Sequence, residues 1–246
     1  MNSLHAVGIS KNFGGLQALR QVDIRVMPGQ IVGLIGPNGA GKSTLLSILA
    51  GEQPPTSGQI LLQERPITRL SAPRRSRLGI ARTFQNLRLF REMTAFENVV
   101  AGCVSWRTGH PLTRRPAVGR VATAALERVR LPRPVWRRPA GELPYIQQRL
   151  LEIARCLATK PQYLLLDEPV AGANDPERDT LADVVVDIAR EGAGVIVIEH
   201  DMRFLFRLAE VVTVLDHGEV ISRGDPQQVQ TDKAVIDAYL GTGAGR

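Results

Sequence analysis

The stretch IVGLIGPNGAGKSTL, residues 31–45, decides most of what the sequence says about the fold. Its first six residues form a continuous apolar run, which is typical of a strand covered on both faces of a parallel sheet. A glycine-rich segment follows, and the apolar segment from Lys42 to Ala50 predicts a helix that ends at Gly51. In the order strand, glycine-rich loop and helix, loop N–H groups and a helix N-terminus can together bind phosphate.

The glycine-rich segment matches the phosphate-binding pattern G-x-x-x-x-G-K-[ST]. The matching residues are Gly36, Pro37, Asn38, Gly39, Ala40, Gly41, Lys42, Ser43 and Thr44. We expect Lys42 to reach the β- and γ-phosphates of a nucleotide and the Ser43 hydroxyl to ligate Mg²⁺. The alternative is a simple glycine-rich turn, but the chain has only four lysines, so a chance match is rare.

An acidic pair ends a second apolar run. Leu164-Leu165-Leu166 is followed by Asp167 and Glu168, and carboxylates at the C-terminal end of a buried strand lie beside the phosphate loop in such folds. We expect Asp167 to hold Mg²⁺ and Glu168 to orient or deprotonate the attacking water. Strands often end in acidic turns, so the pair is informative because it accompanies the phosphate loop. A GTPase is disfavoured, since the chain has no Asn-Lys-x-Asp motif.

The other segments predict an α/β fold. Three short strands, Leu4 to Ser10, Arg20 to Val26 and Gln59 to Leu62, suggest an N-terminal antiparallel sheet. After them, strands and helices alternate, which predicts a parallel sheet in three layers. The further elements are a helix at about 145–159, a strand at 163–167, a helix from Pro176, and strands at 195–199 and 211–215. The fold class expected is a P-loop NTPase (RecA-like) parallel sheet core with an N-terminal antiparallel β subdomain and an inserted α-helical subdomain.

We expect a single domain over residues 1–246. Its parts are a core at about 1–87 and 158–225, a helical subdomain at about 88–157, and a C-terminal helix and tail at 226–246. The stretch from Arg107 to Ala140 is rich in Arg and Pro and predicts an irregular, exposed insert with one amphipathic helix near Val118 to Val129.

Composition favours a globular protein of the cytoplasm. Hydrophobic residues make up 43% of the 246 residues, which is enough for one substantial core. No apolar run approaches the roughly 18 residues needed to cross a bilayer, and the N-terminus lacks the pattern of a signal peptide. Cys103 and Cys156 lie far apart without metal-binding spacing, so we read them as buried or incidental thiols.

Positive charge is concentrated in one region. The net charge is +7, and residues 65–155 contain 19 Arg against five Glu and no Asp. A basic stretch of this kind can bind nucleic acid or anionic lipid headgroups. A solvated, Arg-rich surface without a partner is the equally ordinary alternative.

Over nearly its whole length the chain resembles the ABC transporter ATPases. Within them it looks like the ATP-binding subunits of branched-chain amino-acid importers, and GIARTFQ is similar to the larger, G-type ATPase of that importer pair. The matching stretches are KNFGGLQAL (11–19), IVGLIGPNGAGKSTL (31–45), GIARTFQNLRLF (79–90), MTAFENV (93–99), QQRLLEIARCL (147–157), LLLDEPVAG (164–172) and VIEHDM (197–202). The resemblance implies ATP as substrate, Mg²⁺ as cofactor and hydrolysis coupled to transport.

The resemblance also implies roles for single residues. Phe13 falls where the family stacks adenine on an aromatic ring, although a plain core or surface Phe is the alternative. Gln85 falls in the loop that ligates Mg²⁺ and senses the membrane subunit, and His200 matches the histidine that contacts the γ-phosphate. Residues 171–174 occupy the loop that crosses to the opposite nucleotide in the dimer. The other histidines, His5, His110 and His217, are expected on the surface.

One motif departs from the family pattern. The family signature Leu-Ser-x-Gly-Gln begins a helix and contacts ATP held by the other subunit, whereas this chain reads Leu143-Pro144-Tyr145-Ile146-Gln147. Pro is acceptable at a helix start, so the helix should persist. The Ser hydroxyl is missing and Ile146 replaces the glycine, which puts in doubt the half of a catalytic site that this chain supplies to its partner.

The partners follow from the same resemblance. We expect a second, related ABC ATPase, so that a heterodimer hydrolyses ATP at two unequal sites. Membrane-spanning permease subunits should dock at about residues 86–98, and a periplasmic or extracellular solute-binding protein should act indirectly. The docking segment combines Leu87, Leu89, Phe90, Met93 and Phe96 with Arg88 and Arg91, outside any obvious core periodicity. The expected location is peripheral, on the cytoplasmic face of the plasma (inner) membrane.

A second hypothesis is a soluble ABC protein that acts on nucleic acid or ribosomes, which the Arg-rich stretch would suit. Such proteins usually carry two ATPase units in one chain, a coiled-coil insertion or zinc-binding cysteines, and this chain has none of them, so we expect no nucleic-acid partner. The transported solute stays open, because substrate contacts lie on other subunits. Branched-chain amino acids lead by resemblance, while other amino acids, amides or urea are alternatives.

Overall fold

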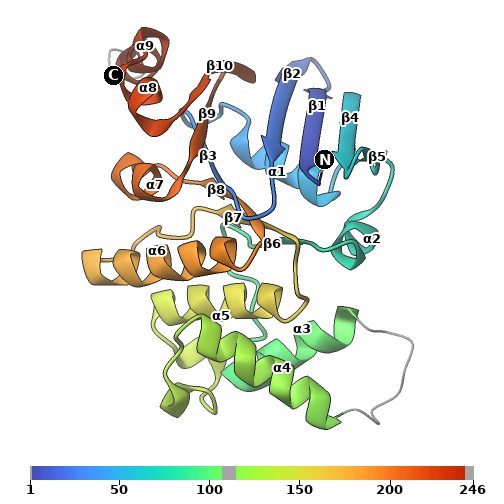
Figure 1. The fold of residues 1–246 in the computed structure, drawn as a ribbon, viewed down its shortest axis with the longest axis vertical. Coiled ribbons are helices and arrows are strands. Elements are labelled where there is room, and N and C mark those ends of the chain that lie inside the picture. The colour runs from blue at the N-terminus through green and yellow to red at the C-terminus, as the bar shows by residue number, and fades with distance from the viewer. Residues whose placement is uncertain (1, 107–114, 242–246) are drawn as a thin grey trace.

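The computed structural model describes residues 2–106 and 115–241, and two β-sheets organise this part of the chain (Figure 1). The larger sheet has six strands in the order β10-β9-β3-β8-β7-β6. They are β3 (Ile31–Ile35), β6 (Ile80–Arg82), β7 (Tyr163–Asp167), β8 (Gly194–Ile198), β9 (Val211–Asp216) and β10 (Glu219–Gly224). All neighbours pair in parallel except β10, which is antiparallel to β9. The predicted parallel sheet is confirmed.

The smaller sheet is antiparallel and has the order β2-β1-β4-β5. Its strands are β1 (Leu4–Phe13), β2 (Leu16–Val26), β4 (Ser57–Leu62) and β5 (Arg65–Pro66). β1 and β2 are longer than the sequence predicts, because they continue to a hairpin tip at which Phe13 pairs with Leu16. This is the N-terminal antiparallel subdomain that the sequence predicts.

The helices cover the larger sheet and form one end of the molecule (Figure 1). They are α1 (Lys42–Ala50), α2 (Ala72–Arg77), α3 (Ala95–Trp106), α4 (Arg115–Arg128), α5 (Tyr145–Leu157), α6 (Asp175–Arg190), α7 (Met202–Leu208), α8 (Pro226–Thr231) and α9 (Lys233–Gly241). Short 3₁₀ turns occur at Arg133–Val135 and Ala140–Glu142. In Figure 1, α3, α4 and α5 lie together at the end opposite α8 and α9. None of the helices in the described ranges is long and apolar enough to cross a bilayer.

The side chains of the central strand β3 alternate between the two faces of the sheet, and a separate apolar core covers each face. Val32 and Leu34 of β3 pack with α1 and the antiparallel sheet, whereas Ile31 and Ile35 pack with the helices on the opposite face. Successive side chains of a strand point to opposite faces, so an entirely apolar strand is what two covered faces require. The three-layered arrangement therefore follows directly from the apolar run IVGLI.

The prediction for Arg107 to Ala140 is right about the amphipathic helix, which forms as α4, but it is wrong that this part of the described chain is simply an exposed insert. Residues 107–114, including His110, lie outside the described residues. The helix α4 follows, and its Ala122 and Leu126 are fully buried, as is Val129 just beyond it. Their spacing places them on one helical face, which packs into the larger core instead of facing solvent.

Part of the Arg-rich stretch is buried and structural. The guanidinium of Arg75 donates to the carbonyls of Ile48 (2.5 Å) and Leu49 (2.9 Å), which end α1. Burial lowers the pKa of Arg75 to about 10, so the group stays charged at neutral pH and complements the helix C-terminus. Arg149 is also fully buried. The Arg-rich stretch is therefore not simply a solvated basic surface.

Candidate functional site

The phosphate loop of residues 36–44 connects β3 to the first turn of α1. At Gly36, where φ is +149°, an added Cβ would lie 2.0 Å from the carbonyl oxygen of Leu215. At Gly41, where φ is +101°, an added Cβ would lie 2.7 Å from the carbonyl oxygen of Ala18 in β2. Both positions therefore require glycine, and the loop is held between β9 and the antiparallel sheet.

Lys42 points back into this loop. Its Nζ donates to the carbonyl oxygens of Gly36 (2.6 Å) and Pro37 (2.9 Å). Burial lowers the pKa of Lys42, and the negative charges of Glu168 and Asp167 partly offset this effect. The loop thus contains a buried cation within electrostatic range of the acidic pair.

The other loop residues differ in their accessibility to a ligand. Asn38, Gly39 and Ser43 are exposed, whereas Ala40 is buried and its N–H donates to the Pro37 carbonyl at 3.2 Å. Thr44 is half-buried. The Ser43 hydroxyl is therefore accessible at the N-terminus of α1, where a ligand would meet unpaired backbone N–H groups.

Glu168 lies just past the end of β7 in an unusual backbone conformation. Its φ is +48°, in the left-handed region that side-chain-bearing residues rarely adopt. His200 Nε2 lies 2.8 Å from Glu168 Oε1, and Gln85 Nε2 donates to Glu168 Oε2 at 3.2 Å. Gln85 and His200, which are far apart in the sequence, are therefore brought together around the carboxylate of Glu168.

Asp167, the last residue of β7, is only 1% exposed. Its Oδ2 accepts a hydrogen bond from Arg82 at 2.8 Å, and its N–H donates to the Thr83 hydroxyl at 3.2 Å. Its other oxygen, Oδ1, is buried and has no hydrogen-bond partner. An unpaired buried carboxylate oxygen is costly, and a hard cation such as Mg²⁺ would satisfy it. The residues present therefore fit a magnesium ion.

Phe13 lies at the tip of the β1–β2 hairpin (Figure 1). It is 47% exposed, and Lys11 Nζ lies 5.0 Å from the centre of its ring. The ring is accessible to a flat ligand, and the same hairpin reaches the phosphate loop through Leu19, which an added Cβ at Gly41 would meet at 2.6 Å.

Of the remaining histidines, His217 is exposed as expected, while His5 is half-buried.

Residues 143–147, which differ from the family signature, lie at the start of α5, as the sequence predicts. Pro144 is the residue before the first turn of the helix, and it is exposed together with Tyr145. Ile146 is half-buried and packs against the larger core. The helix therefore persists without a hydroxyl or a glycine at its start.

Two further positions matter at this site, and sequence reasoning missed both. Arg149 of α5 donates to the backbone carbonyls of Phe84 (2.6 Å) and Gln85 (2.9 Å), and so fixes the loop that carries Gln85. Glu199 is buried and accepts from the N–H groups of Val170 (2.8 Å) and His200 (3.1 Å). Arg149 and Glu199 each stand in a largely apolar segment, and this was the signal that the sequence offered. The sequence alone does not show which groups such a buried charge contacts.

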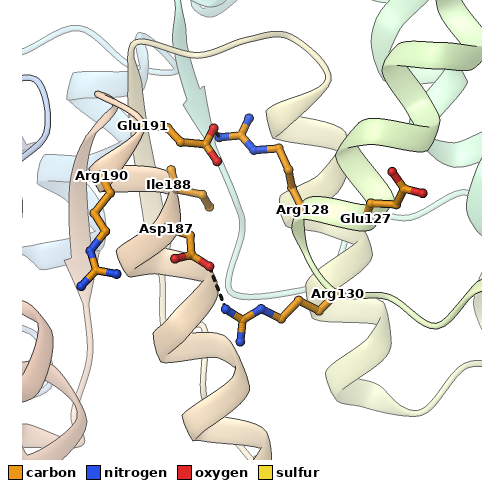
Figure 2. Close-up of a pocket in the computed structure, with 7 residues that line it drawn as sticks. All are labelled: Glu127, Arg128, Arg130, Asp187, Ile188, Arg190 and Glu191. Atoms are coloured by element: carbon orange, nitrogen blue, oxygen red, sulfur yellow. Dashed lines mark hydrogen bonds and ion pairs between the residues drawn. The ribbon is translucent and has the colours of Figure 1, made fainter.

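A charged cavity elsewhere in the described part of the chain is not part of this site. It has a volume of about 340 Å³ and lies between the C-terminal ends of α4 and α6 (Figure 2). Arg130 donates to Asp183 and Asp187, each at 2.7 Å, across the gap between these elements. Exposed pairs of this kind contribute at most about 1 kcal/mol each. No candidate site residue lines the cavity.

Two known families match the chain. Residues 19–171 match the family described as ABC transporter, and residues 219–245 match the family described as Branched-chain amino acid ATP-binding cassette transporter. The chain is 38% identical to the high-affinity branched-chain amino acid transport ATP-binding protein LivG of Escherichia coli (strain K12), over 95% of this chain and 96% of LivG. It is 40% identical to the corresponding protein BraF of Pseudomonas aeruginosa, over 97% of each chain.

Solved structures agree with these matches. One is an ATP-binding cassette of an ABC transporter in its ADP conformation, with a TM-score of 0.88 and 30% identity over 98% of this chain and 99% of that one. Another is a dimeric cassette in a post-hydrolysis state bound to ADP and phosphate, with a TM-score of 0.81 and 25% identity over 91% and 98% of the two chains. The chain therefore belongs to the ABC transporter family, as an ATP-binding subunit that hydrolyses ATP.

Proposed function

We propose that the chain is the motor subunit of an importer for branched-chain or related amino acids. Support comes from the similarity to LivG and BraF, which are named as branched-chain amino acid transport ATP-binding proteins, and from the family match near the C-terminus. Other amino acids, amides or urea are the alternative solutes, since the permease and the solute-binding protein make the substrate contacts. The genes that neighbour this one would narrow the choice most.

One observation carries the proposed chemistry: Glu168 lies between Gln85 and His200, within electrostatic range of Lys42. In this proposal the loop of residues 36–44 binds the phosphates of ATP, and Phe13 stacks on the adenine. Glu168 accepts the proton of the attacking water, and His200 and Lys42 contact the γ-phosphate. Positioning and charge stabilisation of this kind supply most of the rate enhancement in phosphoryl transfer.

The magnesium ion would be held by Ser43, Gln85 and Asp167. Its charge would neutralise phosphate oxygens of the nucleotide. The unpaired Oδ1 of Asp167 and the exposed Ser43 hydroxyl support this assignment. Gln85 adds a link to the docking segment, because that segment begins at the next residue.

The assembly follows from the same roles. We infer that residues 1–246 act as one cassette in a heterodimer with a second, related ABC ATPase, and that closure of the dimer moves the permease. The permease docks at about residues 86–98, where Phe90 is 49% and Met93 is 41% exposed. The chain would then lie at the cytoplasmic face of the plasma (inner) membrane, as a peripheral subunit.

A pull-down at increasing salt tests this function against the nucleic-acid alternative. We expect the tagged chain to recover permease subunits and a second ATPase from solubilised membranes at salt concentrations that release any nucleic acid, because phosphate-backbone contacts weaken steeply with salt. Recovery of nucleic acid at high salt, with no membrane subunit, would contradict the proposal. Radiolabelled leucine, an amide and urea, offered to the intact transporter, would identify the solute class.

A further inference from the structure

Arg82 joins three groups around the acidic pair. One guanidinium nitrogen donates to Asp167 Oδ2 at 2.8 Å. The other donates to the Ser47 hydroxyl and to Glu52 Oε2, each at 2.7 Å. The Arg82 side chain is only 8% exposed, so water screens these contacts little.

These contacts fix the orientation of the Asp167 carboxylate. Arg82 holds one oxygen, and the N–H of Asp167 is held by Thr83, the residue next to Arg82. The other oxygen, Oδ1, is left buried and unpaired. A carboxylate with one oxygen fixed and the other free presents a single oriented ligand, which is how hydrogen bonds to a ligating carboxylate prepare it for a metal.

We propose that Arg82 is a positioning residue that holds Asp167 by Oδ2, so that Oδ1 is oriented to ligate the magnesium ion of the bound nucleotide. This inference rests on the proposed function, in which Asp167 is a metal ligand. Arg82 acts through Asp167 and does not itself touch the metal or the nucleotide.

The shape of the guanidinium explains why an arginine suits this position. Asp167 lies on one side of Arg82, and Ser47 and Glu52 lie on the other, and the planar fork reaches both with separate nitrogens. Lysine carries one compact ammonium group and cannot keep both sets of contacts at these distances. A lysine variant therefore separates the effect of charge from the effect of orientation.

The same residue connects the metal carboxylate to the loop of Gln85. Arg82 ends β6, three residues before Gln85, and its guanidinium lies 5.3 Å from the ring centre of Phe84. The backbone of Phe84 and Gln85 is held in turn by Arg149. The residue that orients Asp167 therefore belongs to β6, the strand that precedes Gln85 and the docking segment.

The test measures the magnesium dependence of nucleotide binding, with a fluorescent ATP analogue as probe. The variants are Arg82→Met and Arg82→Lys, and Glu52→Gln is the matched control that removes the charge of one Arg82 partner but leaves Asp167 held. For Arg82→Met we expect analogue affinity in EDTA to change by less than about twofold, while the Mg²⁺ concentration needed for half-maximal tightening rises about 10- to 100-fold. Arg82→Lys should be intermediate, and Glu52→Gln should stay within about threefold of the parent chain.

Several outcomes would overturn the proposal. One is an unchanged Mg²⁺ dependence of analogue binding in Arg82→Met. Another is a parent chain whose affinity for the ATP analogue does not depend on Mg²⁺, since no metal-binding carboxylate would then need to be oriented. If thermal unfolding shows that Arg82→Met does not fold, Arg82→Lys decides, and parent-like Mg²⁺ dependence in that variant refutes the role of the guanidinium. A parent chain that binds no nucleotide at all would instead contradict the proposed function.

Discussion

Glu168 is the residue on which the proposed chemistry depends. A left-handed φ in a residue with a side chain costs on the order of 1–3 kcal/mol and persists only where the surroundings impose it. Here the N–H of Glu168 donates to the Ile198 carbonyl at 3.0 Å, and its carboxylate contacts Gln85 and His200. The buried Asp167 beside it is held by Arg82 instead, so the two adjacent acids have different partners and can serve different purposes.

Replacing Glu168 by Gln should separate ATP binding from hydrolysis. The amide keeps the shape of the side chain but cannot accept a proton from water, so turnover in the assembled transporter should fall by at least about 10²-fold. Binding of ATP should stay close to that of the parent chain. As the contrasting variant, Lys42→Ala should weaken binding itself, because it removes the buried cation of the phosphate loop. Hydrolysis by Glu168→Gln at the parent rate would show that Glu168 is not the catalytic carboxylate.

Replacing Phe13 by Ala tests the adenine contact. Stacking of a base on an aromatic ring contributes about 1–3 kcal/mol, so ATP affinity should fall roughly 5- to 150-fold. Leu16→Ala is the matched control, because Leu16 pairs with Phe13 at the same hairpin tip and is 68% exposed. Isothermal titration of both variants with ATP makes the comparison. Equal affinities for the two variants would place adenine elsewhere.

At the scale of elements, the docking segment is divided between core and surface. Leu89 and Phe96 are half-buried and pack against the larger core, although the sequence of this segment shows no core periodicity. Phe90 and Met93 are exposed, and Asn98 secures the turn between them by donating to the carbonyls of Phe90 (2.9 Å) and Met93 (3.2 Å). Phe90 and Met93 are therefore the exposed apolar side chains of this segment, and we expect them to contact the permease.

A double change of Phe90 and Met93 to Asp should abolish membrane recruitment. Two buried carboxylates at an apolar interface cost several kcal/mol, whereas both side chains are exposed in the isolated chain. ATP binding should therefore be unchanged. Co-purification with detergent-solubilised permease measures the effect, and Leu16→Asp on the distant hairpin is the control. Unchanged recruitment would exclude this surface.

The sequence predicts elements best where one local pattern determines them. β3, β7, β8 and β9 are continuous apolar runs, and they form where expected. Among the elements that have no such pattern and were not predicted, β6 (Ile80–Arg82) is only three residues long and β10 (Glu219–Gly224) is a half-exposed edge strand. A third example is α2 (Ala72–Arg77), which is stabilised by Arg75 reaching α1.

The residues of the candidate site also differ in how well the sequence predicts them. The phosphate loop is contiguous, so its residues can be identified from spacing alone. Arg82 and Asp167 are 85 residues apart, and Arg149 lies 64 residues from Gln85, so these contacts appear only once the chain is folded. Pairing of charged side chains across the fold leaves no local pattern in one sequence.

At the scale of the whole molecule, we expect the altered signature of α5 to make the two sites of the proposed dimer unequal. This chain carries Lys42, Asp167, Glu168 and His200. In the proposed dimer, the ATP bound by these residues would be contacted by an intact signature motif of the partner ATPase. In the proposed dimer, Pro144 and Ile146 would complete the reciprocal site, which would lack a hydroxyl hydrogen bond to phosphate worth about 1.5–3 kcal/mol. Loss of one such donor typically reduces the rate about 10²- to 10³-fold.

Restoring the signature should therefore activate the isolated chain. The parent chain alone should bind ATP but hydrolyse it poorly, and Pro144→Ser with Ile146→Gly should raise its rate at least about tenfold. Pro144 occupies the N-cap position of α5, where Ser is favoured, so this change alone should not destabilise the helix. Ile146 packs against the core, so unfolding must be measured beside activity. Vigorous hydrolysis by the unmodified chain, with no gain on restoration, would contradict the heterodimer.

The most direct test of the central claim is ATP-driven uptake by the reconstituted transporter, measured with radiolabelled leucine in proteoliposomes. If this chain is the motor at the site of Glu168, parent assemblies should accumulate leucine only with ATP and Mg²⁺. Assemblies containing Glu168→Gln should lose hydrolysis and uptake together, by at least about 10²-fold. Uptake that continues at the parent rate when this chain carries Glu168→Gln would contradict the account.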